Sequence, residues 1–486
     1  MKIVITASEC VPFVKTGGLA DVAGALAKVL KQQGHDVVVF LPNYKKVDAK
    51  AFALKTVYQG LQIPMGEKIE KADLKVSTKV EGVPVYFVDN PGYFNRDELY
   101  RTATGDYEDN GERFVFFSKA VLEGLKAIDF QPDIIHAHDW QVGMVPTFLK
   151  TSYKYDSFFA QTGTVFTIHN LAYQGSYPRE LMYLAGVSFE EFTPEKLEFW
   201  GSMCIIKGGI VYSDIVTTVS KTYAKEILTE EFGRGLDGVL KNRQEHLYGI
   251  INGIDYDEWN PRTDTHLEFN YDAKTLANKE EGKKKFLQNC KLPYSAKTPV
   301  IGIVSRLDPQ KGFDILGEAM EEIMKLDLQF VLLGKGDTDL QNLFAAIGKK
   351  YPKKTSINIT FDNKVAHQIY AGSDMFLMPS YFEPCGLGQL ISLKYGTIPI
   401  VHETGGLADT IKEYSPTSGK GNGFSFKEYT GATLVQTIKR AVALYQKKAE
   451  WAKLVSNAMK SDFSWDKVIP EYIELYEKAA HKKETR

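Results

Sequence analysis

The chain has 486 residues, and at roughly 100–200 residues per domain this length predicts more than one domain. Hydrophobic residues make up 44% and charged residues 25%, which excludes a disordered chain, a collagen-like repeat and a disulfide-stapled mini-protein. The 59 basic and 61 acidic residues leave a net charge of -2. This balance disfavours nucleic-acid binding, for which a basic excess is typical.

The cysteines and the N-terminus indicate a compartment. No pair among Cys10, Cys204, Cys290 and Cys385 has CxxC spacing, which disfavours a thiolate metal site or a redox dithiol and fits a reducing environment. No apolar run reaches the ~18 residues of a membrane-spanning helix, and the first apolar run is too short for a signal peptide. The sequence therefore predicts a cytoplasmic protein without a membrane partner.

Short apolar runs alternate with stretches of helical periodicity along the first half. Strands are expected at Lys2–Ala7, Asp36–Leu41, Val83–Val88, Asp133–Ala137, Thr164–Ile168 and Ile215–Val219. A helix is expected over Asp21–Gln33, with Gly34 as the residue after its end. Alternation of this kind predicts an α/β fold with a parallel sheet covered on both faces.

The alternation pauses after Asn252 and then begins again. Residues 253–298 are rich in charge, Asn and Lys, and Lys283–Lys285 is interpreted as a solvated helix face. Further elements are expected at Pro299–Ser305, Phe313–Leu326 (a helix), Gln329–Leu333, Asn358–Phe361, Met375–Pro379 and Ile398–Val401. We therefore predict two doubly wound domains, 1–252 and 253–460, with ligands bound at the carboxyl ends of the strands in a cleft between them.

One hexapeptide occurs twice. Thr16–Asp21 is repeated unchanged as Thr404–Asp409, and each copy opens a predicted helix. Glycines there would let the backbone approach a ligand, and free helix amides favour an anion or hydroxyl groups. Two ordinary glycine-rich turns are the alternative. Lys15 precedes the first copy and is placed for a phosphate.

Polar residues follow two predicted strands of the first half. His138, Asp139 and Trp140 follow one strand, and His169 and Asn170 follow the next. These side chains are expected at the ligand-binding edge of the sheet. His136 alternates away from His138 and is as well explained by a structural hydrogen-bonding role. No HExxH motif is present, so zinc is disfavoured.

Two loops of the second half add charge. Arg306 and Lys311 can converge on one diphosphate, and their loop lacks the spacing of a P-loop NTPase. Glu383 precedes a predicted helix, and the amides of residues 385–387 are potential donors. A helix-terminal carboxylate and a buried small hydrophobe are the alternatives for Glu383 and Cys385. Two DxD patterns, at 255–257 and 337–339, are too short to predict a metal.

As an ordered set, these motifs resemble those of bacterial glycogen synthases and starch synthases, glycosyltransferase family five. The resemblance covers nearly the whole chain and rests on Lys15–Asp21, His136–Trp140, Thr167–Gly175, Ile251–Asp255, Ser305–Gly312, Glu383–Leu387 and Thr404–Asp409. It implies a GT-B fold with two Rossmann-like domains. It also implies that a C-terminal helix, expected over Ser461–Lys478 within 461–486, packs back on the first domain.

The resemblance implies transfer of glucose from ADP-glucose to the non-reducing end of an α-1,4-glucan, with retention and without a metal or cofactor. UDP-glucose is the less expected donor, and glycogen and starch both remain open as products. A leaving phosphate oxygen would take the acceptor proton on the same face of the sugar. Double displacement through Asp139 or Glu383 is the alternative route.

Carried over residue by residue, the resemblance gives each motif a role. The implied catalytic residues are Glu383, Asp139, His169, Arg306 and Lys311. The implied substrate-binding residues are Lys15 and Gly18 at the diphosphate and sugar, Phe361 against adenine, Trp140, Asn170 and Asn252, and Cys385, Gly386 and Leu387 at the glucose hydroxyls. Tyr381 and Gly388 replace an Arg and a Thr that are common in the family, which bears on donor affinity.

Three other functions compete. A glycoside hydrolase could use Asp139 and Glu383 as paired carboxylates, but it would not need Lys15 or the cations of the 305–312 loop. A phosphorylase would need a lysine-bound pyridoxal phosphate and a longer chain. A non-catalytic glucan-binding protein would be marked by loss of the cationic or Glu383 motif, and both are present.

Overall fold

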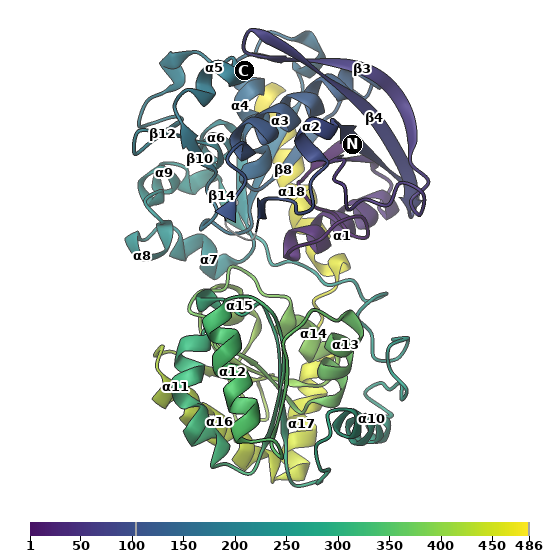
Figure 1. Cartoon of the computed structure of the whole chain (residues 1–486), viewed down its shortest axis with the longest axis vertical. Coiled ribbons are helices and arrows are strands. Elements are labelled where there is room, and N and C mark those ends of the chain that lie inside the picture. Colours follow the sequence, from purple (N-terminus) through teal and green to yellow (C-terminus); the bar gives the residue numbers. More distant parts are fainter. Residues whose placement is uncertain (103–104, 485–486) are drawn as a thin grey trace. The chain divides into compact units, whose positions relative to one another are not determined.

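The computed structural model describes residues 1–102 and 105–484, with side chains through residue 480. The chain forms two compact units (Figure 1). Unit 1 contains Met1–Gly253 and Trp465–Arg486, and unit 2 contains Ile254–Ser464. The second unit is therefore an insertion in the first, and each has its own hydrophobic core.

Unit 1 is built on a nine-stranded sheet in the order β14-β13-β9-β8-β1-β2-β5-β4-β3. The strands from β14 to β5 are parallel, whereas β4 is antiparallel to both of its neighbours. Their bounds are β1 Lys2–Thr6, β2 Asp36–Pro42, β3 Lys55–Met65, β4 Lys68–Val80, β5 Val83–Asp89, β8 Ile134–His138, β9 Gly163–Ile168, β13 Ile215–Thr218 and β14 Leu247–Gly249. The sequence predicted β1, β2, β5, β8, β9 and β13, and it missed β14 and the β3–β4 hairpin.

Helices and short strands complete unit 1. The helices are α1 Gly18–Gln32, α2 Pro91–Phe94, α3 Asn110–Ala127, α4 Met144–Lys150, α5 Leu181–Ala185, α6 Ile205–Tyr212, α7 Lys221–Glu226, α8 Glu230–Gly233, α9 Asp237–Asn242 and α18 Trp465–Glu484. The short strands are β6 Arg101–Thr102, β7 Gly105–Asp106, β10 Ser176–Pro178, β11 Glu198–Phe199 and β12 Ser202–Cys204. The predicted C-terminal helix starts at Trp465, after Ser461.

The first helix shows why the sequence folds as it does. Leu19, Val22, Leu26 and Leu30 recur at the spacing of one helix face, and all four are buried. Gly34, with φ 85°, supplies the left-handed residue that ends the helix. The C-terminal helix α18 packs against α1, β8 and β9, and it is the yellow helix beside β8 in Figure 1.

Unit 2 contains a six-stranded parallel sheet in the order β17-β16-β15-β18-β19-β20. Its strands are β15 Val300–Val304, β16 Gln329–Leu333, β17 Thr355–Asn358, β18 Met375–Met378, β19 Ile398–His402 and β20 Phe424–Phe426. Its helices are α10 Leu276–Asn289, α11 Phe313–Met324, α12 Thr338–Lys350, α13 Asn363–Gly372, α14 Gly388–Lys394, α15 Gly405–Thr410, α16 Gly431–Tyr445 and α17 Lys448–Lys460. Helices lie on both sides of this sheet (Figure 1).

Two predictions for unit 2 were wrong. The strand expected at Asn358–Phe361 is β17, which ends at Asn358, so Phe361 lies in the loop before α13. The lysines of α10 do not form one solvated face, because Lys283 is 2% exposed and its ammonium lies 2.8 Å from Asp374. An ion pair across two elements stabilises this burial, and a run of three lysines gives no local sign of it.

Candidate active site

The carboxyl ends of β8 and β9 bring Asp139 and His169 together in unit 1. The backbone N–H of His169 donates to Asp139 Oδ1 at 2.7 Å, and the N–H of Asp139 donates to Thr167 O at 2.9 Å. Asp139 has φ 63°. A left-handed conformation at a residue other than glycine costs of order 1–3 kcal/mol and is characteristic of functional sites. Asp139 thus has a strained backbone, and the His169 N–H fixes the position of its carboxyl group.

Burial controls the charge of Asp139. The residue is 8% exposed, and burial raises the pKa of its carboxyl to about 7. The N–H groups of His169 and Asn170 lower this pKa, and the nearby Glu9 carboxylate raises it further. Asp139 therefore titrates close to neutral pH, in the range that suits a group taking part in proton transfer or binding a hydroxyl group.

Three histidines lie close together on β8 and directly after β9. His138 Nδ1 lies 2.9 Å from His169 Nε2, so one of these two rings donates to the other. His136 contacts Tyr476 of α18 at 2.8 Å and Thr167 at 2.6 Å through its two ring nitrogens. Burial lowers the pKa of each of the three imidazoles. They are therefore neutral at neutral pH, and the structural interpretation of His136 is confirmed.

Trp140 follows Asp139 and is packed from several sides. It is 8% exposed and makes an edge-to-face contact with Phe114 at 5.1 Å. A Cβ at Gly175, which has φ 63°, would lie 2.3 Å from the indole ring, so only glycine fits there. Asn170 is half-buried beside His169. The loop after β9 is thus fixed against Trp140.

The first hexapeptide copy lies at the start of α1. Lys15, about half exposed, pairs with Asp21 at 2.7 Å, and Gly18 is the first residue of the helix. A Cβ added to Gly17 would meet no atom within 4 Å. The loop therefore presents a cation and an open backbone surface at the end of a 15-residue helix.

Glu9 and Tyr100 were missed by the sequence analysis. The Glu9 carboxylate is 4% exposed and accepts hydrogen bonds from Thr16, Gly17 and Tyr100. The available signal was an acidic residue directly after a buried strand. Tyr100 gave no such signal, because Glu9, to which its hydroxyl donates, is 91 residues away in the sequence.

Asn252 follows β14 and is nearly buried. Its side chain is 4% exposed, and Oδ1 has no hydrogen-bond partner within the described residues. Leaving a buried amide oxygen unpaired costs about 1–3 kcal/mol. A ligand hydroxyl group could satisfy this oxygen.

In unit 2, Lys311 and Glu383 form an ion pair at the carboxyl edge of the sheet. Lys311 Nζ lies 2.7 and 2.9 Å from the two carboxylate oxygens, and Ser380 Oγ donates to Glu383 at 2.9 Å. Both side chains are largely buried, with 18% and 7% exposed. Gly312 makes this approach possible, because a Cβ there would lie 1.9 Å from Pro379 O. Arg306, on the same loop, is exposed.

The Gln389 side chain fixes the backbone between Glu383 and α14. Gln389 Nε2 donates to the carbonyls of Cys385 and Gly386 at 3.0 and 2.9 Å. Gly386 has φ 75°, and Leu387 precedes the first residue of α14. Cys385 is 5% exposed, so its thiol is buried as the alternative interpretation expected, while its backbone belongs to this turn.

The remaining predicted positions are less enclosed. Phe361 is 69% exposed, and Tyr381 contacts Tyr429 with a centroid distance of 5.0 Å. A Cβ at Gly388 would lie 2.9 Å from Phe376 Cε1 and 3.3 Å from the sulfur of Met378. A threonine at 388 would thus require these side chains to shift, which explains why glycine stands there.

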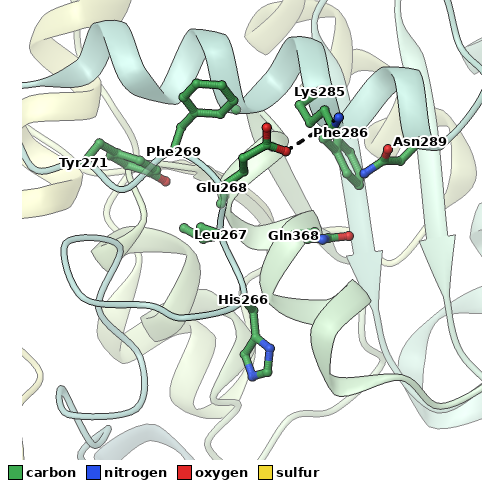
Figure 2. Close-up of a pocket in the computed structure, with 12 residues that line it drawn as sticks. His266, Leu267, Glu268, Phe269, Tyr271, Lys285, Phe286, Asn289 and Gln368 are labelled. Carbon is green, nitrogen blue, oxygen red and sulfur yellow. Dashed lines mark ion pairs between the residues drawn. The ribbon is translucent and has the colours of Figure 1, made fainter.

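Two hollows lie within single units and contain none of the predicted site residues. One, between the 266–271 loop, α10 and α13, has a volume of about 50 Å³ (Figure 2). That is far below the ~300 Å³ of a small-molecule site. The other, of about 690 Å³, is lined by α7, β14 and α18. Within the described residues, no group of His, Cys, Asp and Glu could hold a metal ion, and no helix is long and apolar enough to cross a membrane.

Comparison with known proteins identifies the family. Residues 2–242 match the starch synthase catalytic domain model, and residues 288–457 match the glycosyl transferases group 1 model. The chain is 48% identical to the glycogen synthase of Pseudothermotoga lettingae over 490 residues, covering 100% of both sequences. The chain belongs to the glycogen and starch synthase family. The resemblance inferred from the motifs is confirmed.

Further relatives fit the same family. The glycogen synthase of Desulforudis audaxviator is 47% identical over 99% of this chain and 97% of its own length. The catalytic domain of Starch Synthase IV from Arabidopsis thaliana, bound to ADP and acarbose, has a TM-score of 0.92 at 34% identity, with 99% of both chains covered. Like other glycogen and starch synthases, the chain is a glycosyltransferase with the GT-B fold.

Proposed function

We propose that this glycosyltransferase moves glucose from ADP-glucose to the non-reducing end of an α-1,4-glucan, with retention of configuration and release of ADP. The family assignment supports this activity, and so do the ADP and acarbose bound to the similar starch synthase. The observation that carries the proposal is the buried Lys311–Glu383 pair, a cation and an acceptor of sugar hydroxyl groups held together. The paired-carboxylate mechanism of a glycoside hydrolase does not require such a cation.

On the donor side, we propose that Lys311 and Arg306 stabilise the negative charge that develops on the leaving ADP. Lys15 and the α1 N-terminus at Gly18 would contribute further donors to the diphosphate and sugar. Phe361 is exposed and can stack on adenine through its ring face. UDP-glucose would lack that larger ring system.

On the sugar, Glu383 would accept hydrogen bonds from glucose hydroxyls while the amides of Cys385, Gly386 and Leu387 donate. Lys311 would then lie between the Glu383 carboxylate and the diphosphate. Because Lys311 already holds Glu383 at 2.7 Å, the carboxylate needs little rearrangement when the donor binds.

Asp139, Trp140, His169, Asn170 and Asn252 are proposed to bind sugar hydroxyls in unit 1. A neutral imidazole can donate one hydrogen bond and accept another, which matches a hydroxyl group. The unpaired Asn252 oxygen would accept from such a group.

We propose same-face transfer without an enzyme nucleophile. The bond from glucose to the ADP oxygen breaks, the acceptor oxygen bonds to the anomeric carbon, and the phosphate oxygen takes the acceptor proton. Two contacts support this route over double displacement. Oδ1 of Asp139 accepts from His169, and both oxygens of Glu383 are bound by Lys311. Carboxylates held in this way are suited to binding more than to attack.

The test is nucleotide release with excess EDTA from ADP-glucose or UDP-glucose, each with and without glycogen. Glycogen-dependent ADP release that survives EDTA is expected. Lys311→Ala should reduce donor turnover about 100-fold or more, as loss of one transition-state donor does, while glycogen binding persists. Lys325→Ala is the matched control, because Lys325 is exposed and pairs only locally with Glu322. Glycogen breakdown with no nucleotide release would instead identify a hydrolase.

A further inference from the structure

A buried acidic side chain organises the first hexapeptide copy. Oε2 of Glu9 accepts from the backbone N–H groups of Thr16 and of Gly17, the latter at 3.2 Å. Oε1 accepts from the Thr16 hydroxyl at 2.5 Å and from the Tyr100 hydroxyl at 2.7 Å. Four neutral donors therefore surround one carboxylate, and no lysine, arginine or histidine within the described residues forms an ion pair with it.

This arrangement decides which way the loop faces. The N–H groups of Thr16 and Gly17 point at Glu9, and α1 has no side-chain cap at its N-terminus. A Cβ at Gly17 would meet no atom within 4 Å, and the Lys15 side chain, two residues earlier, is 47% exposed. The carboxylate thus holds the inner side of the loop and leaves the outer side, with the first N–H groups of α1, for a ligand.

The carboxylate also ties this loop to a distant segment. Tyr100 O accepts from Asn110 Nδ2 at 2.8 Å, and Asn110 accepts from the buried Arg113 at 2.5 Å. Arg113 donates further to the carbonyl of Leu99 at 3.0 Å. A continuous set of buried and partly buried hydrogen bonds therefore runs from α3 through Tyr100 to the loop. A partly satisfied network of this kind is costly, so we expect a change at Glu9 to disturb the loop that its carboxylate holds.

We propose that Glu9 is a positioning residue for the donor substrate: with Tyr100, it fixes the Lys15–Gly18 loop in the orientation that receives the sugar nucleotide. Glu9 itself does not touch the reacting atoms. The inference rests on the proposed function, because it assumes that Lys15 and Gly18 contact the nucleotide sugar.

Glu9→Gln tests this with the smallest change. One carboxylate oxygen becomes an NH₂ group, which faces donors on either side and cannot accept from them. We expect the KM for ADP-glucose to rise about tenfold or more, as for loss of a charge-assisted hydrogen bond, with the KM for glycogen within about twofold. Tyr100→Phe removes one of the four donors and should raise the donor KM about threefold. Binding of ADP to the folded variants, measured by calorimetry, should weaken in the same order.

Glu191→Gln is the matched control. Its carboxylate also accepts from a tyrosine hydroxyl, that of Tyr212, and pairs with Lys196, but it contacts neither Glu9 nor the Lys15–Gly18 loop, so donor KM should not change. Wild-type turnover of ADP-glucose is measured first, and its absence would count against the proposed function alone. With an active wild type, a folded Glu9→Gln protein with unchanged donor KM overturns the inference. So does a parallel change in both KM values and in melting temperature. If Glu9→Gln does not fold, Tyr100→Phe decides by the same criteria.

Discussion

The two copies of the hexapeptide have the same six residues and different surroundings. In the first, Gly17 has φ -153° and open space where a Cβ would be, and its N–H donates to the buried Glu9 carboxylate. In the second, a Cβ at Gly405 would lie 2.0 Å from Glu383 O, and one at Gly406 would lie 2.1 Å from Cys385 O. The first copy has open space beside Gly17, whereas the second copy packs both of its glycines against another stretch of backbone.

The same contrast extends to charge. At the carboxyl ends of the unit 1 strands, Asp139 is buried and accepts from the His169 N–H, and no cation within the described residues pairs with it. At the edge of unit 2, Glu383 is paired with Lys311, and the Gly406 N–H donates to Glu383 O at 3.0 Å. The same six residues therefore lie beside differently charged strand ends in the two units. The residues that pack against each copy determine its role.

The largest expected effect tests the charge difference. Native Asp139 keeps its proton up to about pH 7, whereas an unfolded Asp loses it near pH 4. The stabilisation from the raised pKa is complete below about pH 4 and is lost as pH rises to about 7, by about 1.4 kcal/mol per pH unit. The free energy of unfolding in urea should be measured for wild type and for Asp139→Asn across this range. The difference between the two proteins should fall by roughly 4 kcal/mol as pH rises from about 4 to about 7. The histidines, with lowered pKa, act in the opposite direction in both proteins and cancel. Parallel curves would show that Asp139 does not titrate there.

Next in size is the steric difference between the two copies. Gly406→Ala places a methyl group against the Cys385 backbone and should lower the free energy of unfolding by about 2–3 kcal/mol, as overpacking does. Gly17→Ala should change it by no more than about 0.5 kcal/mol. Denaturant midpoints measured side by side check both. Equal losses would abolish the distinction between the copies.

The Gly17→Ala protein also sharpens the functional side of the comparison. Its added methyl group lies on the open side of the loop, where a ligand would approach. We expect the KM for ADP-glucose to rise about tenfold, equivalent to about 1.4 kcal/mol, at unchanged melting temperature. Steady-state kinetics with glycogen in excess measures this. Wild-type kinetics in this variant would mean that no ligand approaches the first copy.

The smallest effect concerns an exposed residue of unit 2. Phe361 is 69% exposed, and a stacked aromatic ring contributes about 0.5–1.5 kcal/mol. Phe361→Ala should weaken ADP binding about fivefold, and Phe361→Tyr should stay within about twofold of wild type. Calorimetric titration with ADP and UDP compares them. A loss that is equal for both nucleotides would argue against stacking on adenine.

Much of the fold could be read from the sequence because buried parallel strands are short apolar runs. The run at Gln329–Leu333 was predicted with its observed bounds, and the strand before Asp139 within a residue or two. The β3–β4 hairpin was missed for the converse reason. Its strands expose one face, so apolar residues such as Ile63 and Leu74 alternate with charged ones and form no run.

The site was harder to read because its contacts join distant parts of the chain. The prediction that Asp139 and His169 lie together is confirmed, because the pairing of β8 with β9 brings the ends of both strands to the same side of the sheet. The burial of Lys283 depends on Asp374, and the role of Glu9 depends on Tyr100. Neither partner leaves a local pattern in the sequence, so such pairs become visible only once the chain is folded.

The position of α18 has a consequence for how the protein is made. Gly253 and Trp465 both belong to unit 1, while the next residue inward at each point, Ile254 and Ser464, form a bridge within unit 2. The ribosome must therefore synthesise all of unit 2 before it synthesises α18, the helix that packs on β8 and β9. Until then His136 lacks the Tyr476 hydroxyl. Unit 1 is therefore the first unit to be started during synthesis and the last to be completed.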